Sequence, residues 1–310
     1  MSGSEAGELQ HIERGLLADD PAFLSAFDAA AAELAGPRRV VASPGPVVTA
    51  VDGSPASMAA VRWAARYAEH VDADLRIVHA FRWPAFPDQF GVVDTCAHDA
   101  SRGAHDLVRA AAELARGVSP AIRVDGRVVD GGVGPVLRRH ATEAGLLVLG
   151  RAHLTATRGV LRLSTAAGVT SRIRCAVTVV PAPRVELDAS RCTGLVVVCQ
   201  DGIAADVPAL QLAFELAEHE GGGLQAMCSP GSERRVRNRI ATVRRDFPSV
   251  QVVRTTATGD PFDTLLRASA GAAAVVLDRE DATLTAARRG RGCRRLLNAS
   301  SCPVVFTARR

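Results

Sequence analysis

The sequence VTAVDG at residues 48–53 reappears as VVCQDG at residues 197–202. Two further blocks return in the same order: LLVLGR at 146–151 as AVVLDR at 274–279, and CAVTV at 175–179 as CPVVF at 302–306. Blocks that repeat in a fixed order indicate a tandem duplication of one structural unit. We therefore expect two copies of one unit in a single chain, the second of them shorter in its middle.

The chain is long enough, at 310 residues, for two domains of ordinary size and an extension. Leu9, Ile12 and Leu16 recur at helix spacing, and Gly36-Pro37 ends the helical pattern. The predicted organisation is a helical N-terminal extension at 1–40, a first domain at 45–183 and a second, degenerate domain at 192–310.

In each unit, short runs rich in Val and Leu alternate with amphipathic segments. This alternation is typical of βαβ units, which build a doubly wound α/β domain around a parallel sheet, here with five strands per unit. Strands are expected at 47–51, 75–80, 122–129, 146–150 and 176–180, and again at 195–199, 223–228, 250–256, 273–277 and 303–307. Helices are expected near 56–70, 98–116, 134–144, 164–173 and 231–246.

The composition argues against several classes of protein. The chain contains no lysine, so it has neither the lysine of a Walker-type phosphate loop nor a Schiff-base lysine. Its seven cysteines include no C-x-x-C pair, which argues against a zinc site or a disulfide framework and favours a reducing compartment. No apolar run reaches the roughly 18 residues of a membrane span, and the first residues are acidic and polar, unlike a signal peptide. We expect a cytoplasmic protein that does not contact the membrane.

The charge and the motifs indicate a function without catalysis. A formal charge of +4 is mild, and no nucleic-acid-binding motif is present, so nucleic acid is not an expected partner. The arginines at 288–295 are interpreted as a solvated helix face. We find no Ser/His/Asp order around a nucleophile elbow and no metal-ligand spacing. Weak ATP hydrolysis is the most that we expect of the chain as an enzyme.

Candidate functional residues stand where strands end. Open α/β sheets bind ligands beyond the carboxyl ends of their strands. Asp52, Ala80, Asp130 and Gly150 hold such positions and are expected to converge, with Asp201, Gly259 and Asp278 as their counterparts in the second unit. Two neighbours have simpler interpretations, Ser54 as the N-cap of the first helix of the unit and His79 as a hydrogen-bonded histidine in the core or at the edge of the site.

The residues at these strand ends carry a family resemblance. Val51-Asp52-Gly53-Ser54, LRIVHA at 75–80, LVLGR at 147–151 and the closing strand after Cys175 resemble the universal stress protein family. The resemblance spans residues 45–310 as two tandem copies. It implies an ATP site in many members, a homodimer, and antiparallel pairing of the terminal strands 176–180 and 303–307, here inside one chain as a pseudo-dimer.

A shorter resemblance covers the start of the chain. Residues 9–23, LQHIERGLLADDPAF, are similar to the soluble start of a family of small actinobacterial membrane proteins of unknown function, whose membrane segments are absent here. The resemblance implies that the N-terminal helices dock on an unknown protein partner and take no part in chemistry.

Nucleotide-binding universal stress proteins carry G-x2-G-x9-G-(S/T) after the fourth strand, where backbone N–H groups and a helix N-terminus surround the phosphates. Gly150 matches the first glycine of this motif and Ser164 the final hydroxyl, but His153 and Leu163 replace the second and third glycines. Mg²⁺ is expected only together with nucleotide. The candidate nucleotide-binding residues are Asp52, Gly53, Ala80, Gly150, Arg151, His153, Ser164 and Thr165.

The second unit departs further from the motif. Asp278, Asp281, Arg291 and Gly292 occupy its four positions, and two carboxylates would repel a triphosphate. Two interpretations of the chain therefore stay open. One is a regulatory, stress-adaptive protein that binds ATP or another adenine nucleotide in its first domain. The alternative is a nucleotide-independent protein-interaction module with both sites inactive.

Overall fold

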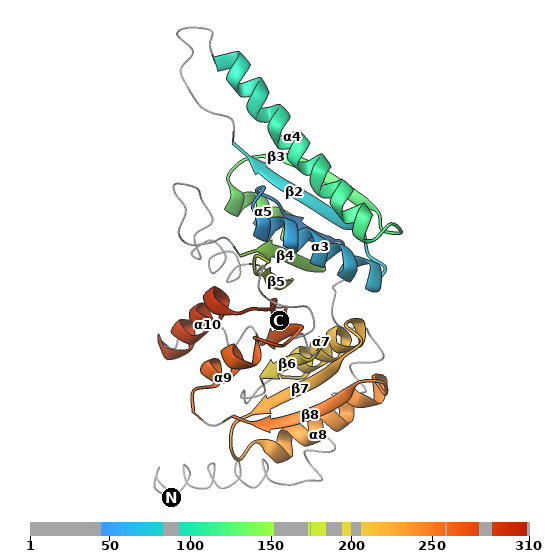
Figure 1. Cartoon of the computed structure of the whole chain (residues 1–310), viewed down its shortest axis with the longest axis vertical. Coiled ribbons are helices and arrows are strands. Elements are labelled where there is room, and N and C mark those ends of the chain that lie inside the picture. Colours follow the sequence, from blue (N-terminus) through green and yellow to red (C-terminus); the bar gives the residue numbers. More distant parts are fainter. Residues whose placement is uncertain are drawn as a thin grey trace, which may run out of the picture. The chain divides into compact units, whose positions relative to one another are not determined.

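The computed structural model describes residues 45–82, 93–151, 173, 175–183, 194–199, 206–257, 259–278 and 287–308 (Figure 1). The chain divides into two compact units, Met1–Arg39 and Val40–Arg310, and the fold below belongs to the second. The helices predicted within residues 1–40 lie outside the described residues, and so does the helix predicted at 164–173 apart from residue 173.

The strands of the described residues form one sheet in the order β3-β2-β1-β4-β5-β10-β9-β6-β7-β8. Neighbours on either side of the β5–β10 pair run parallel. β5 and β10 pair antiparallel, with Val305 opposite Thr178, so the sheet is continuous and mixed. The strands are β1 (Val47–Ala50), β2 (Leu75–Phe81), β3 (Val124–Asp130), β4 (Leu146–Gly150), β5 (Ala176–Val180), β6 (Val196–Cys199), β7 (Gly223–Cys228), β8 (Gln251–Thr256), β9 (Ala274–Leu277) and β10 (Val304–Phe306).

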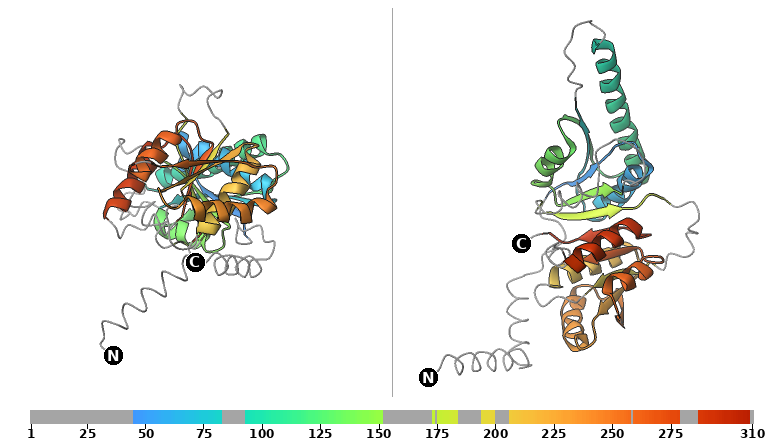
Figure 2. Two further views of the ribbon diagram at one scale, coloured as in Figure 1. Left: turned by 90° about the horizontal axis from the view of Figure 1, so that it is seen from below. Right: turned by 90° about the vertical axis from the view of Figure 1, so that its left-hand side faces the viewer.

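Helices cover both faces of this sheet (Figure 2). One hydrophobic core contains residues of the helices α3, α4, α7 and α8, and a second contains residues of α5, α9 and α10. Successive side chains of a strand point to opposite faces, so Val47 lies in the first core and Val48 in the second. The helices are α3 (Pro55–His70), α4 (Val93–Val118), α5 (Val133–Ala141), α7 (Asp206–His219), α8 (Glu233–Val243), α9 (Pro261–Ala268) and α10 (Ala287–Ala299), with a 3₁₀ turn η2 (Arg244–Asp246).

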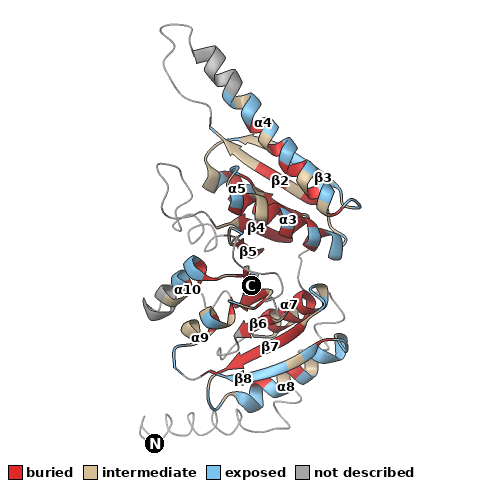
Figure 3. Ribbon diagram, viewed as in Figure 1, coloured by how far each residue is buried: buried red, intermediate tan, exposed pale blue. Residues whose placement is uncertain are grey.

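Burial on both faces explains the continuous apolar runs in the sequence. The central strands β5 and β9 are buried along their whole length and β4 is buried up to Gly150, whereas β8 at one end of the sheet is largely exposed (Figure 3). A parallel sheet with two covered faces requires strands that are hydrophobic on both sides. Cys175 and Cys302 each stand just before one of the two strands β5 and β10, and both side chains are buried.

Helix α3 begins where the sequence predicts. The Ser54 hydroxyl accepts a hydrogen bond from the Ser57 N–H at 3.2 Å, and Pro55 follows in the first turn. Small side chains on the inner face, among them Ala60, Ala64 and Ala68, are fully buried and let the helix lie close to the strands. The strand end that precedes α3 is therefore held firmly in place.

One predicted helix differs in form. Residues 231–246 were expected to be a single helix, but α8 ends at Val243 and the chain continues as the 3₁₀ turn η2. Pro248 follows closely, and a proline disfavours helical conformation in the residue before it. Among the described residues, no helix is long and apolar enough to cross a membrane.

Candidate functional site

A pocket of about 60 Å³ opens at the carboxyl ends of β1, β2 and β4. Three of the strand-end residues predicted to converge, Asp52, Ala80 and Gly150, line it together. Asp130, the fourth, ends the outer strand β3 and is not among the lining residues. The full lining is Ala50, Val51, Asp52, Ser57, Val78, His79, Ala80, Val133, Leu137, Leu149 and Gly150.

Asp52 forms a tight turn with the start of α3. Its Oδ1 accepts hydrogen bonds from the Ser54 N–H at 3.0 Å and from the Ser54 hydroxyl at 2.6 Å, while the Asp52 N–H donates to the Ser57 hydroxyl at 3.3 Å. Burial raises the pKa of the Asp52 carboxyl, but the hydrogen bonds from Ser54 and Ser57 outweigh it, so the pKa is lowered overall. Asp52 is therefore a carboxylate at neutral pH. Gly53 completes the turn with a φ of 82°, a conformation that glycine adopts without strain.

Two helices begin at the pocket. Ser57 lies in the first turn of α3 and Val133 is the first residue of α5, and both line the pocket. Neither helix has an acidic residue in its first turn, so neither positive helix end is neutralised from within. The pocket thus combines one fixed carboxylate with two helix ends that favour negative groups.

His79 lies at the edge of the site, as the sequence predicts. Its Nδ1 is 2.8 Å from the Val51 carbonyl oxygen, so Nδ1 carries the proton and donates it. This bond ties the end of β2 to the end of β1. Ala80, the next residue, is half-buried in the pocket wall.

Gly150 is required by packing. A Cβ built at this position would lie 2.5 Å from the Ala56 carbonyl carbon and from the Ser57 nitrogen. The first turn of α3 therefore passes directly over the end of β4, which a larger residue would prevent. The glycine has this role whatever the pocket binds.

Arg151 was predicted to face a nucleotide, but its described contacts lie elsewhere. Its Nη1 donates to the carbonyl oxygen of Ser300 at 2.7 Å and to that of Leu297 at 3.2 Å, at the C-terminal end of α10. A cation at a helix C-terminus is favourable because the last carbonyls carry partial negative charge. Arg151 thereby links the end of β4 to the part of the chain that carries α10.

Substitution of Arg151 by methionine is expected to lower the free energy of unfolding by about 2 kcal/mol, since two charge-assisted hydrogen bonds are lost. Urea denaturation would measure the change. Arg116→Met is the matched control, because exposed Arg116 donates one long bond of 3.4 Å to Val124 and should cost less than about 0.5 kcal/mol. Equal losses in the two variants would contradict this role of Arg151.

The remaining predicted residues cannot be placed in the pocket. His153, Ser164 and Thr165 lie outside the described residues, as does the whole loop that they belong to. Sequence reasoning did not single out Ser57, Val133 or Leu137. Val133 and Leu137 are four residues apart on α5, a spacing that puts them on one helix face, so a search for that pattern next to a strand end could have found them.

The end of β9, which corresponds in sequence to the end of β4, has a different residue. Asp278 follows β9 where Gly150 ends β4, and its side chain is buried. The Thr307 hydroxyl lies 3.5 Å from Asp278 Oδ1, within reach to donate to it. Gly259 has a φ of 92° and precedes Asp260, which caps α9 by accepting from the Phe262 N–H at 2.8 Å. Asp201, Asp281 and the side chain of Arg291 lie outside the described residues.

The predicted solvated face of α10 is confirmed where its side chains are described. Arg294 and Arg295 are exposed, and Arg295 forms an ion pair with Asp263 at 2.6 Å. In the described part of the chain, no group of three or more His, Cys, Asp or Glu side chains is placed to hold a metal ion.

Comparison with known proteins identifies part of the chain. Residues 45–181 match the model of the universal stress protein family. A universal stress protein of Mycobacterium tuberculosis is 28% identical over 201 residues, which cover 58% of this chain and 61% of that protein. The chain therefore spans about three fifths of the length of this relative.

Two solved structures are also similar. A universal stress protein from Archaeoglobus fulgidus has a TM-score of 0.65 at 14% identity, over 86% of this chain and 98% of that chain, which shows a shared fold. A universal stress protein in complex with cAMP is 29% identical with a TM-score of 0.34, over 45% of this chain and 98% of that chain. The match at 45–181 and the M. tuberculosis relative show that this part of the chain is similar to the universal stress protein family, and the A. fulgidus structure shows a shared fold.

Proposed function

We propose that the chain is a regulatory, stress-adaptive protein whose first domain binds ATP or another adenine nucleotide in the pocket beside Asp52. The observation that carries the proposal is the convergence of Asp52, Ala80 and Gly150 at one pocket, where α3 and α5 begin without acidic residues in their first turns. A carboxylate suits the hydroxyls of a ribose, and helix N-termini suit phosphates.

Six of the candidate residues have a role in the proposed site. Asp52 Oδ1 is already occupied by Ser54, so we assign Oδ2 to the ribose hydroxyls. The backbone at Ala80 contacts the adenine. His153, Ser164 and Thr165 follow β4 in the chain and are assigned to the phosphates, with Mg²⁺ bound only through the nucleotide. Arg151 holds α10 and so connects the site to the second part of the sheet.

We further propose that residues 192–310 are a degenerate second copy of the domain at 45–183. Support comes from the strand order, because β1 lies between β2 and β4 just as β6 lies between β7 and β9. The antiparallel β5–β10 pair would then join the copies as a pseudo-dimer. An N-terminal extension at 1–40 that contacts a protein partner, a homodimer and a cytoplasmic location belong to the same proposal.

Asp52→Ala is expected to weaken binding of ATP with Mg²⁺ at least tenfold, because a charged hydrogen-bond acceptor is lost. Isothermal titration calorimetry on the whole chain would measure the affinity, with cAMP, the ligand of one solved relative, as a second titrant. Asp130→Ala is the matched control, since Asp130 is an exposed carboxylate at a neighbouring strand end outside the pocket lining, and it should leave the affinity unchanged.

Absence of saturable binding by the wild-type chain at millimolar ATP and cAMP would refute the nucleotide proposal. The alternative is then the nucleotide-independent interaction module. Two observations favour that alternative: Ser54 occupies one oxygen of Asp52, and Arg151 is engaged with α10. Release of ADP that is lost in Asp52→Ala would instead indicate hydrolysis.

A further inference from the structure

Helix α8 and the turn that follows it carry an excess of positive charge. Residues 233–246, which form α8 and η2, contain six arginines against Glu233 and Asp246, a formal charge of +4. The buried residues of α8 are Val236, Ile240 and Val243, so arginines occupy most of its opposite, solvent-facing side. The exposed arginines of this face are Arg234, Arg235, Arg237, Arg244 and Arg245.

The strand β8, near this helix, ends the sheet. No described strand pairs with its outer edge. The Ala257 N–H donates to the Cys228 carbonyl oxygen of β7 at 2.8 Å, which fixes the direction of the backbone groups along β8. In a parallel pair, alternate residues direct both backbone groups toward the partner strand. The N–H and C=O groups of Val252, Arg254 and Thr256 therefore point outward, at a spacing that a further strand can pair with.

β8 exposes both an apolar and a charged side chain. Val253 is 53% exposed, the largest exposure of any large hydrophobic side chain among the described residues. Arg254 is exposed and forms no ion pair in the described part of the chain. By strand alternation Arg254 points to the same face as Val252, the face whose core includes residues of α8. Arg254 thus extends the charge of the helix to the edge of the sheet.

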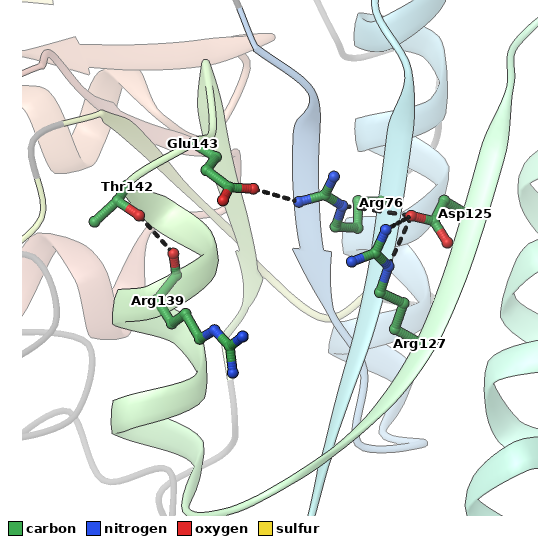
Figure 4. A network of polar contacts seen from close by, with 6 residues as sticks. All are labelled: Arg76, Asp125, Arg127, Arg139, Thr142 and Glu143. Carbon is green, nitrogen blue, oxygen red and sulfur yellow. Dashed lines mark hydrogen bonds and ion pairs between the residues drawn. The ribbon is translucent and has the colours of Figure 1, made fainter.

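The opposite edge of the sheet is protected in a way that β8 is not. On β3, Asp125 pairs with Arg127 at 2.7 Å and with Arg76 of β2 at 3.5 Å, and Arg76 also reaches Glu143 at 3.1 Å (Figure 4). Charged side chains at an edge are a common defence against pairing with another strand. There the charges are balanced within the chain, whereas Arg254, the charged residue of β8, forms no ion pair with any described residue.

Charge decides which occupant suits β8. A second copy pairing through β8 would bring two sets of arginines together, and like charges repel. A long nucleic acid would run past both ends of the patch toward Glu233 and Asp246, and it offers no backbone groups for a strand edge. A polypeptide with acidic side chains satisfies both the open edge and the arginines.

We propose that β8 and α8 form a docking site at which an extended, acidic segment of a partner protein adds a strand to the sheet. Its main-chain groups pair with Val252, Arg254 and Thr256, its carboxylates face Arg254 and the α8 arginines, and an apolar side chain covers Val253. Addition of a strand to an open edge is a recurring mode of peptide recognition.

The probe for this site is a fluorescein-labelled peptide of about ten residues that alternates Glu with Val and Thr, titrated into the full chain with anisotropy detection. The peptide with Lys for Glu is its charge-reversed control. Amide exchange measured by NMR should show protection of Val252, Arg254 and Thr256 on addition of the acidic peptide, without change at Val253. Arg234→Gln combined with Arg237→Gln should weaken binding and reduce its salt dependence, and Arg62→Gln, an exposed arginine on α3, should not.

Two variants of Arg254 separate the contribution of its backbone N–H to peptide binding from that of its side-chain charge. Arg254→Pro removes an outward N–H at an edge, where proline is tolerated, and should weaken binding about tenfold or more. Arg254→Gln keeps the N–H and should weaken binding about threefold. Thermal unfolding would check that both variants fold. The proposal would be overturned if the Lys peptide bound as tightly as the Glu peptide, or if folded Arg254→Pro bound the Glu peptide with unchanged affinity. It would also be overturned if a DNA oligonucleotide bound more tightly than the Glu peptide, or if the chain self-associated and Arg254→Pro abolished that self-association.

Discussion

Substitution of Gly150 by alanine is expected to lower the free energy of unfolding by about 3 kcal/mol. The added Cβ would lie 2.5 Å from the Ala56 carbonyl carbon and the Ser57 nitrogen and 2.6 Å from the Ala56 oxygen. All three atoms belong to backbone at the start of α3, so relief of the clash requires that the helix move away from β4. The loss is unusual for a change of one methyl group and would be measured by urea denaturation.

Gly103→Ala is the matched control for this variant. Gly103 lies within α4, and a Cβ at its position meets no atom within 4 Å. Alanine favours helix over glycine, so this change should stabilise the chain by up to about 1 kcal/mol. If the two alanine variants shift the stability by similar amounts, the close approach of α3 to β4 is not what requires glycine at 150. The comparison also explains why Asp52, and not Gly150, is the informative position for a test of ligand binding.

Acid is expected to destabilise the chain through His219. The ring of His219 lies 4.5 Å from that of His70 on α3 and meets the edge of Tyr67 at 6.3 Å between centroids. Burial, followed by the nearby His70 and Arg66, lowers the pKa of His219 to about 4, against the opposing effect of Glu69. The carboxylate of Glu220 is 4.0 Å from His219 Nε2.

The direction of the pH effect follows from this lowered pKa. The unfolded chain takes up a proton on His219 near pH 6.5, whereas the folded chain takes it up only near pH 4. Stability from this group is therefore complete above about pH 6.5 and is lost as the pH falls toward 4. The pKa difference corresponds to about 2–3 kcal/mol once partial solvent screening is allowed for.

Denaturation of the wild-type chain and of His219→Gln at pH 7 and at lower pH would measure this contribution. The variant should lose less stability on acidification. The difference between the two proteins is the part of the acid-induced loss of unfolding free energy that is due to His219. His105→Gln, at an exposed histidine of α4, should follow the wild-type profile. Parallel curves for wild type and His219→Gln would show that the histidine does not control the response.

The residues at the strand ends show how much of the candidate site could be predicted from the local sequence pattern. Asp52, Ala80 and Gly150 could be assigned to one pocket before any coordinates, because parallel strands place their carboxyl ends at one edge of a sheet. Asp130 could not be excluded in the same way. It ends a strand like the others, and only the position of β3 at the outside of the sheet separates it from the pocket.

Some contacts could not be predicted from the local sequence pattern, as Arg151, Gly150 and His219 show. Arg151 follows a strand end and stands among candidate phosphate ligands in sequence, yet its Nη1 donates to carbonyl groups more than a hundred positions away. Gly150 resembles a loop glycine, although the atoms that exclude a side chain belong to α3. The ring partners of His219, Tyr67 and His70, likewise lie far from it in sequence, on helix α3.

The sequence by itself determined the alternation of strands and helices, the start of α3 at Ser54 and the strand-end positions of the candidate residues. Each of these depends on residue periodicity, turn residues and helix caps, which act over a few positions along the chain. Only the tertiary structure decided that α8 and β8 present one arginine-rich edge and that Arg151 caps α10. Those features depend on distances between segments remote in sequence, and such distances arise only when the sheet and its helices pack together.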